Sequence, residues 1–186
     1  LEARLRSPYA PLFLAAYSFI ETAITLLPID PFAIAVMSIN KRRVYTTAFF
    51  IVVGSLSGAL VGYAVGHYAF GSWSAYFLDT PTRVATFEHL KTIFLANEFL
   101  IVFATAFVPI PKTPTILAAG FLSGSILWYA VAWTLGRSLH FAAEAFLVKT
   151  VAQDNLSSSM RVLTGASIVV AFGVVAYFVL QCAGLA

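Results

Sequence analysis

One uncharged apolar run, from Val44 to Gly66, limits what this chain can fold into more than any other feature of its sequence. It exceeds the ~20 residues that an α-helix needs to cross the hydrocarbon core of a bilayer. Two more runs of this kind extend over Thr113–Gly136, continued through Val148, and over Val162–Ala186. Only 10% of the residues are charged, against about 25% in an average soluble domain. We therefore predict an all-α integral membrane protein.

Two further apolar regions are interrupted by prolines. The first runs from Pro8 to Asn40 and contains "LPIDPF", and the second runs from Phe99 into "PIPKTP". Each has about ten to fifteen apolar residues on either side of its prolines, which is too short for a spanning helix and too apolar for a surface loop. We predict that both regions are re-entrant helical hairpins.

The two interruptions resemble each other. "PIDP" and "PKTP" each place a charge between two prolines, Asp30 in the first and Lys112 in the second. Asp30 and Thr113 are good helix N-caps, and the proline after each suits the first helical position. The shared pattern predicts an internal repeat in which each hairpin is followed by a transmembrane helix.

The resulting single membrane domain has four parts. The first repeat covers 8–66, an interfacial amphipathic helix covers 80–96, the second repeat covers 97–149, and a C-terminal transmembrane helix covers 161–186. The interfacial helix is predicted because its apolar residues share one face, namely Val84, Phe87, Leu90 and Phe94.

The distribution of cations predicts the orientation. If each hairpin enters and leaves on one side, seven cations share a face: Arg4, Arg6, Lys41, Arg42, Arg43, Lys149 and Arg161. Only Arg83 and Lys91 lie on the other face. The positive-inside rule makes the first face cytoplasmic, so the hairpins enter from opposite sides as an inverted repeat, and the C-terminus emerges opposite the cytoplasm. The net charge of +3 therefore indicates topology, and we expect no nucleic-acid partner.

Six charged or titratable residues at membrane depth are the candidates for function, because such residues are costly inside a bilayer. Lys112 lies at a hairpin tip, far from either interface, and Glu21 and Asp30 belong to the first hairpin. The other three form one stripe of a helix at i, i+3 and i+7, namely Arg137, His140 and Glu144. His140 and Glu144 are either a structural pair or a proton relay.

These segments carry a family resemblance. "FIETAITLLPIDPFAIA", "FVPIPKTPTILAAGFLSG" and "LGRSLHFAAEAFLV" resemble the DedA superfamily, also called SNARE-associated or VTT-domain proteins, and within it the YqaA-like branch. The wider family has a second turn like R-F-x-P-x-x-R, where this chain has Ala106 and Lys112. The resemblance implies a lipid scramblase, flippase or transporter of the bacterial inner membrane, linked to proton motive force. It also implies that Glu21 and Asp30 are the acidic pair and Lys112 the basic site.

The residues themselves favour the same kind of function. Two half-helix N-termini near the midplane, with Lys112, Thr113 and Arg137, would bind an anion such as a phosphate. The resemblance implies that this phosphate belongs to a lipid such as phosphatidylethanolamine or undecaprenyl phosphate. Two alternatives stay open, a proton-coupled transporter of small solutes or ions and a scaffold without transport activity. An enzyme is not expected, because H-E-x-x-H and G-x-S-x-G are absent, and neither a cofactor nor a metal is predicted.

Glycines recur every four residues in the first spanning helix, at Gly54, Gly58, Gly62 and Gly66. This spacing places them on one helical face, where another backbone can approach closely. The face could pack against helices of the same chain, form a homodimer or line a lipid groove.

Overall fold

The computed structural model describes residues 9–24, 29–108 and 112–150. The secondary structure in these ranges is α-helical, as predicted, and the helices are α2 (Ala10–Ile24), α3 (Asp30–Ile39), α4 (Val44–Phe77), α5 (Pro81–Ala96), α6 (Glu98–Phe107), α7 (Thr113–Phe121) and α8 (Ile126–Thr150). The predicted C-terminal helix at 161–186 lies outside the described residues, as does the predicted side of the C-terminus.

Among these helices, α4 is the one that is by itself long and apolar enough to cross a membrane, over Val44–Ser72. A second candidate span is the pair α5 and α6, which is bent by 75° at Asn97. The predicted helix from Val44 to Gly66 is therefore present with the length and apolar character that a span requires, and α4 continues to Phe77.

The helix predicted from Thr113 through Val148 is wrong as one continuous element. It ends at Phe121 and starts again at Ile126. Ser123 between them adopts the left-handed conformation, with φ of 54°, and the Gly124 N–H returns to the Ala119 carbonyl at 3.1 Å. This turn closes the C-terminus of α7 in the usual way.

The predicted helix starts are close to correct. Thr80 caps α5, and its side chain accepts a hydrogen bond from the Arg83 N–H. Asp30 and Thr113 are each the first residue of their helix instead of its N-cap, a position held by Ile29 and Lys112 without a side-chain hydrogen bond. The proline after each still lies in the first turn, where its missing N–H costs no helical hydrogen bond.

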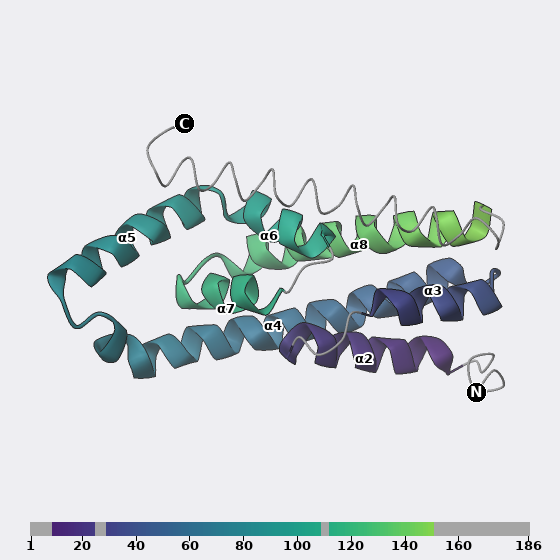
Figure 1. Cartoon of the computed structure of the whole chain (residues 1–186), viewed down its shortest axis with the longest axis horizontal. Helices are drawn as coiled ribbons and strands as arrows, with labels where there is room; N and C mark the ends of the chain where they lie inside the picture. The colour runs from purple at the N-terminus through teal and green to yellow at the C-terminus, as the bar shows by residue number, and fades with distance from the viewer. Residues whose placement is uncertain (1–8, 25–28, 109–111, 151–186) are drawn as a thin grey trace.

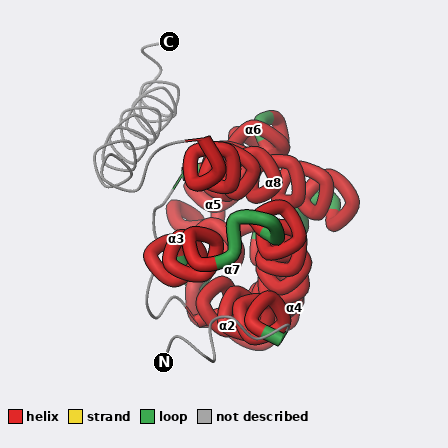
Figure 2. The backbone as a smooth tube through the Cα atoms, turned by 90° about the vertical axis from the view of Figure 1, so that its right-hand side faces the viewer, coloured by secondary structure: helices red, strands yellow, loops and turns green. Residues whose placement is uncertain are grey.

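Two helix pairs fold back on themselves, and their tips point toward each other. Figure 1 shows α2 and α3 meeting near the middle of the molecule, and α6 and α7 meeting there from the opposite direction. Figure 2 shows that these helices belong to one bundle with α4 and α8. The end of α2 and the start of α7 therefore lie near the centre, where α8 passes.

The packing repeats between the two halves of the chain. Helix α4 packs against α2 and α7, whereas α8 packs against α6 and α3, and α4 and α8 contact each other. Exchanging α2, α3 and α4 for α6, α7 and α8 converts one set of contacts into the other. This is the pattern expected of two structurally equivalent units.

The glycine face of α4 packs inside the chain. Gly54 and Gly58 face the backbone of α2, and Gly62 and Gly66 face α7. A Cβ atom at Gly54 would collide with the backbone of Ala15, so glycine is required for this close approach. Because the chain's own helices cover the face, the alternative of a homodimer through these glycines does not fit the structure.

The cations predicted to share a side lie at one end of the bundle, as far as they are described. The Lys149 Nζ atom is 5.1 Å from the ring centre of Tyr45, which joins the end of α8 to the start of α4. Lys41, Arg42 and Arg43 directly precede α4 at the same end. Arg83 lies in α5, toward the opposite end (Figure 1).

Candidate functional site

The six charged or titratable residues predicted from the sequence gather at the centre of the bundle. They come from α2, α3, the residue before α7, and one stripe of α8. Five of them are buried, namely Glu21, Lys112, Arg137, His140 and Glu144, and Asp30 is half-buried. The cluster divides into two groups of three that adjoin along α8.

The Glu21 triad consists of Glu21, Lys112 and Arg137. Lys112 Nζ lies 3.3 Å from Glu21 Oε1 and forms a buried ion pair. Arg137 Nη2 lies 3.9 Å from Glu21 Oε2, too far for a hydrogen bond. One carboxylate therefore balances two cations that reach it from different parts of the chain.

Arg137 is fully enclosed. Its side chain is 0% exposed, and none of its three guanidinium nitrogens has a hydrogen-bond partner among the residues that the structure describes. Its Cζ atom lies 4.5 Å from the centre of the Phe141 ring, a cation–π contact that satisfies no N–H. Since a buried charged group without hydrogen bonds is costly, the guanidinium offers several donors to an anion.

The His140 triad consists of His140, Asp30 and Glu144. His140 Nε2 lies 3.4 Å from Asp30 Oδ1 and 3.4 Å from Glu144 Oε1. The other oxygen of Glu144 is buried without a hydrogen-bond partner. Both carboxylates approach the same ring nitrogen, so the single Nε2–H can donate to one of them at a time, and a proton held on His140 would place a positive charge between the two.

The His140 triad also has the spacing of a metal site. One ligand atom from each of Asp30, His140 and Glu144 lies within 4.8 Å of the others. Histidine nitrogen and carboxylate oxygens are common ligands of Zn²⁺ and related ions. The sequence alone did not predict this set, because Asp30 is distant from the other two along the chain.

A row of hydrogen-bonded side chains that was not predicted from the sequence contacts the Glu21 carboxylate. The Thr22 hydroxyl donates to Glu21 Oε2 at 3.3 Å and lies 2.9 Å from Ser55 Oγ. Trp133 Nε1 donates to the same Ser55 oxygen at 3.1 Å. Small hydroxyl residues inside apolar helices were the available signal, since such side chains often bond across helices in membranes. These hydrogen bonds connect the Glu21 carboxylate on α2 to Ser55 on α4 and Trp133 on α8.

The predicted substrate-binding set of Glu21, Asp30, Lys112, Thr113 and Arg137 is thus brought to one region. Thr113 is half-buried and directly follows Lys112 as the first residue of α7. The stripe of Arg137, His140 and Glu144 is confirmed as one buried face of α8. The role of each residue in transport stays a prediction.

Comparison with known proteins gives one relative. The chain is similar to an uncharacterized protein of Haemophilus influenzae. The two are 27% identical over 176 residues, which cover 93% of this chain and 90% of the relative. No family model matches the chain, and no solved structure matches it. The relative has a comparable length, and its name assigns no activity.

Proposed function

We propose that this chain is a lipid transporter of the bacterial inner membrane, built as the DedA resemblance implies. In this proposal α2–α3 and α6–α7 are re-entrant hairpins that enter from opposite faces and meet near the midplane. The equivalent contacts of α4 and α8 support an inverted repeat. Helix α5 then lies at the interface on the side away from Lys41 to Arg43.

The location of apolar and charged side chains supports the membrane setting. Large apolar side chains are exposed along the outside of the bundle, including Leu12, Phe13, Phe49, Val61, Leu135, Leu139 and Phe146. The charged triads lie inside. A water-soluble protein rarely exposes so extensive an apolar surface, whereas lipid would cover it at no cost.

The observation that carries the proposed function is the Arg137 guanidinium, whose nitrogens have no hydrogen-bond partner among the described residues, beside the ammonium of Lys112. Both approach Glu21, and both are buried. A phosphate ester would supply the acceptor oxygens that Arg137 lacks, and charge-assisted hydrogen bonds of this kind are the strong ones. We assign this place to the lipid phosphate during transfer, while the acyl chains stay in the bilayer.

Glu21 then acts as an internal counter-ion. With no phosphate bound, its carboxylate balances Lys112 and Arg137. An incoming phosphate and the ionised carboxylate compete for the same two cations, because like charges close together at low dielectric repel strongly. An arriving phosphate therefore takes the place of the Glu21 carboxylate beside Lys112 and Arg137.

The charge balance of the whole cluster supports proton coupling. Three carboxylates, Glu21, Asp30 and Glu144, face two cations, Lys112 and Arg137, and one histidine. One proton on His140 or on a carboxylate makes the cluster neutral, and burial favours the neutral set. His140 and Glu144 are therefore proposed as the route by which that proton reaches or leaves the cluster.

Transport should be measured in proteoliposomes that contain fluorescent lipids. The proposal predicts that the protein accelerates exchange between leaflets for phosphatidylethanolamine or a polyprenyl phosphate, and does not accelerate it for a glycosyl diacylglycerol with the same chains, whose sugar head group is polar but lacks the phosphate. Equal exchange of all three lipids would contradict a phosphate site. Uptake of a soluble anion without lipid exchange would support the alternative of a small-solute transporter.

A further inference from the structure

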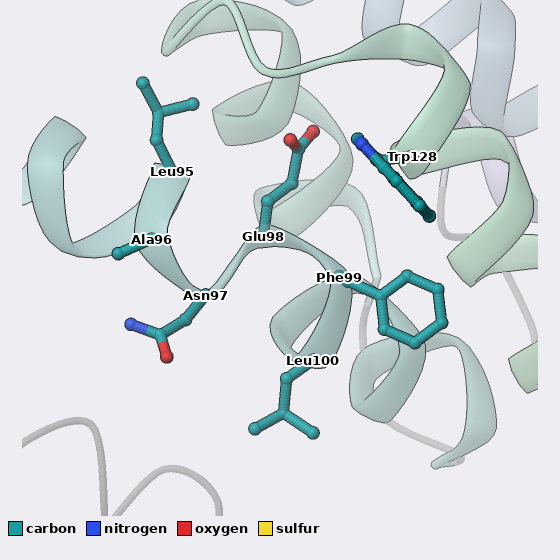
Figure 3. A pocket seen from close by; sticks show the side chains of 7 residues that line it. All are labelled: Leu95, Ala96, Asn97, Glu98, Phe99, Leu100 and Trp128. Carbon is teal, nitrogen blue, oxygen red and sulfur yellow. The ribbon is translucent and has the colours of Figure 1, made fainter.

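An open cavity of about 350 Å³ lies away from the central cluster, at the junction of α5, α6 and α8. It is lined by Leu95, Ala96, Asn97, Glu98, Phe99, Leu100 and Trp128. Figure 3 shows the Glu98 carboxylate beside the Trp128 ring, with Phe99 below them. In the proposed topology the cavity opens near the membrane surface on the non-cytoplasmic side.

The two carboxylate oxygens of Glu98 differ in their hydrogen bonding within the described residues. Oε2 accepts a hydrogen bond from the Ser125 N–H at 3.0 Å, where the chain enters α8. Oε1 is buried beside Gly124, and among the described residues it has neither a hydrogen-bond partner nor a salt bridge. The residue is 7% exposed. A buried carboxylate in this condition favours a cation that can donate to Oε1.

The walls of the cavity fit an organic cation on an apolar chain. The rings of Phe99 and Trp128 meet edge to face with centres 6.2 Å apart, and aromatic rings attract ammonium groups. Around them the rim is apolar and exposed, with Leu100 47% and Trp128 57% exposed. The hydrogen bond from Ser125 accounts for Oε2 as a helix-capping acceptor, but it does not account for Oε1 or for the open aromatic wall.

We propose that this cavity binds the ammonium head group of a membrane lipid such as phosphatidylethanolamine, with Glu98 as the counter-ion. The lipid chains lie along the apolar rim. As a head-group selection site this inference rests on the proposed lipid transport, and it favours an amine-bearing phospholipid over a polyprenyl phosphate. Binding can be measured without transport, so the two proposals can fail separately.

The test compares binding of phosphatidylethanolamine and phosphatidylglycerol to the purified full-length protein by native mass spectrometry. These lipids share a phosphodiester and differ in the amine. We expect the wild-type chain to prefer phosphatidylethanolamine and Glu98→Gln to lose that preference by about tenfold, since a buried ion pair is removed. The glutamine oxygen can still accept from Ser125, so the thermal midpoint should change little. Glu88→Gln, which changes an exposed acid on α5, should keep the preference.

A second variant keeps the test decisive if Glu98→Gln does not fold. Trp128→Ala removes an exposed wall of the cavity and leaves Glu98 in place, so it should weaken phosphatidylethanolamine binding while the protein stays folded. The proposal is overturned if wild-type protein does not distinguish the two lipids, or if a folded Glu98→Gln or Trp128→Ala protein keeps the full preference. Loss of transport in a Lys112 variant that still selects phosphatidylethanolamine would leave this site intact.

Discussion

Lys112 Nζ lies 3.3 Å from Glu21 Oε1 in a buried ion pair between two residues that are 91 positions apart in the sequence. The pair joins the tips of the two helix pairs α2–α3 and α6–α7. Neither helix pair alone could stabilise its charge at this depth. Removing one partner of a buried pair leaves an uncompensated charge, so the pair couples the two halves of the chain. The relation between Glu21, Lys112 and Arg137 therefore determines both the packing at the centre and the proposed phosphate chemistry.

The pH dependence of transport tests the role of Glu21 as counter-ion. In the wild-type protein, transport should depend on pH, because one proton neutralises the net charge of the central cluster. Glu21→Gln removes the competing charge, so transport should persist with a flatter pH profile. Lipid exchange in proteoliposomes across a pH series measures the pH profiles of the wild type and of Glu21→Gln.

Two comparisons complete this test. Glu88→Gln on the exposed face of α5 should leave the wild-type profile unchanged. If Glu21→Gln and Asp30→Asn both retain full transport with the wild-type pH dependence, proton coupling through these carboxylates is wrong.

The stability of glycine variants tests the packing of α4. Gly54→Ala places a methyl group against the backbone of α2, so it should lower the stability by about 1–3 kcal/mol, as overpacking does. Gly71→Ala is the matched control, because nothing lies within 4 Å of a Cβ atom at Gly71. It should leave the stability unchanged or raise it by about 0.5–1 kcal/mol through better helix propensity. Thermal unfolding in detergent ranks the stabilities of the two variants and the wild type. Equal midpoints for the two variants would argue against the close contact of α2 and α4.

The sidedness of the bundle tests the proposed topology. Single cysteines in place of Arg42 and Thr150, with Cys182 changed to serine, should react with a membrane-impermeant reagent from the same side, the cytoplasm. A cysteine in place of Arg83 should react from the other side. Labelling of positions 42 and 150 from opposite sides would contradict the inverted repeat.

The sequence predicted the breaks and the buried charges because both depend on local chemistry. A proline breaks the interior of a helix and is tolerated only in its first turn, and a charge in an apolar run must be enclosed or paired. The contact of Asp30 with His140 could not be predicted from the sequence, because it depends on the position of α3 against α8.

Other features were missed for different reasons. The turn at Ser123 was not predicted because its residues continue an apolar run, although the sequence "LSGS" contains turn-forming residues. The homodimer alternative for the Gly54 face failed because a small-residue stripe shows that a backbone comes close but not which backbone. Glu98 was not singled out from the sequence, because its place beside Trp128 depends on the position of α6 against α8.

The most direct test of the central claim is lipid exchange by Lys112 variants. Wild-type, Lys112→Ala, Lys112→Arg and Arg83→Ala proteins should be reconstituted at equal density, with folding checked by thermal unfolding. Arg83 is the matched control, because its ion pair with Asp79 is exposed and contributes little.

If Lys112 and Arg137 hold the lipid phosphate, Lys112→Ala should reduce phospholipid exchange by about tenfold or more while the protein stays folded, because a buried charge-assisted contact is lost. Lys112→Arg should retain part of the activity, since the charge survives with altered geometry, and Arg83→Ala should match the wild type. A folded Lys112→Ala protein that exchanges phosphatidylethanolamine and polyprenyl phosphate at the wild-type rate would contradict the account, and Lys112 would then be a structural partner of Glu21.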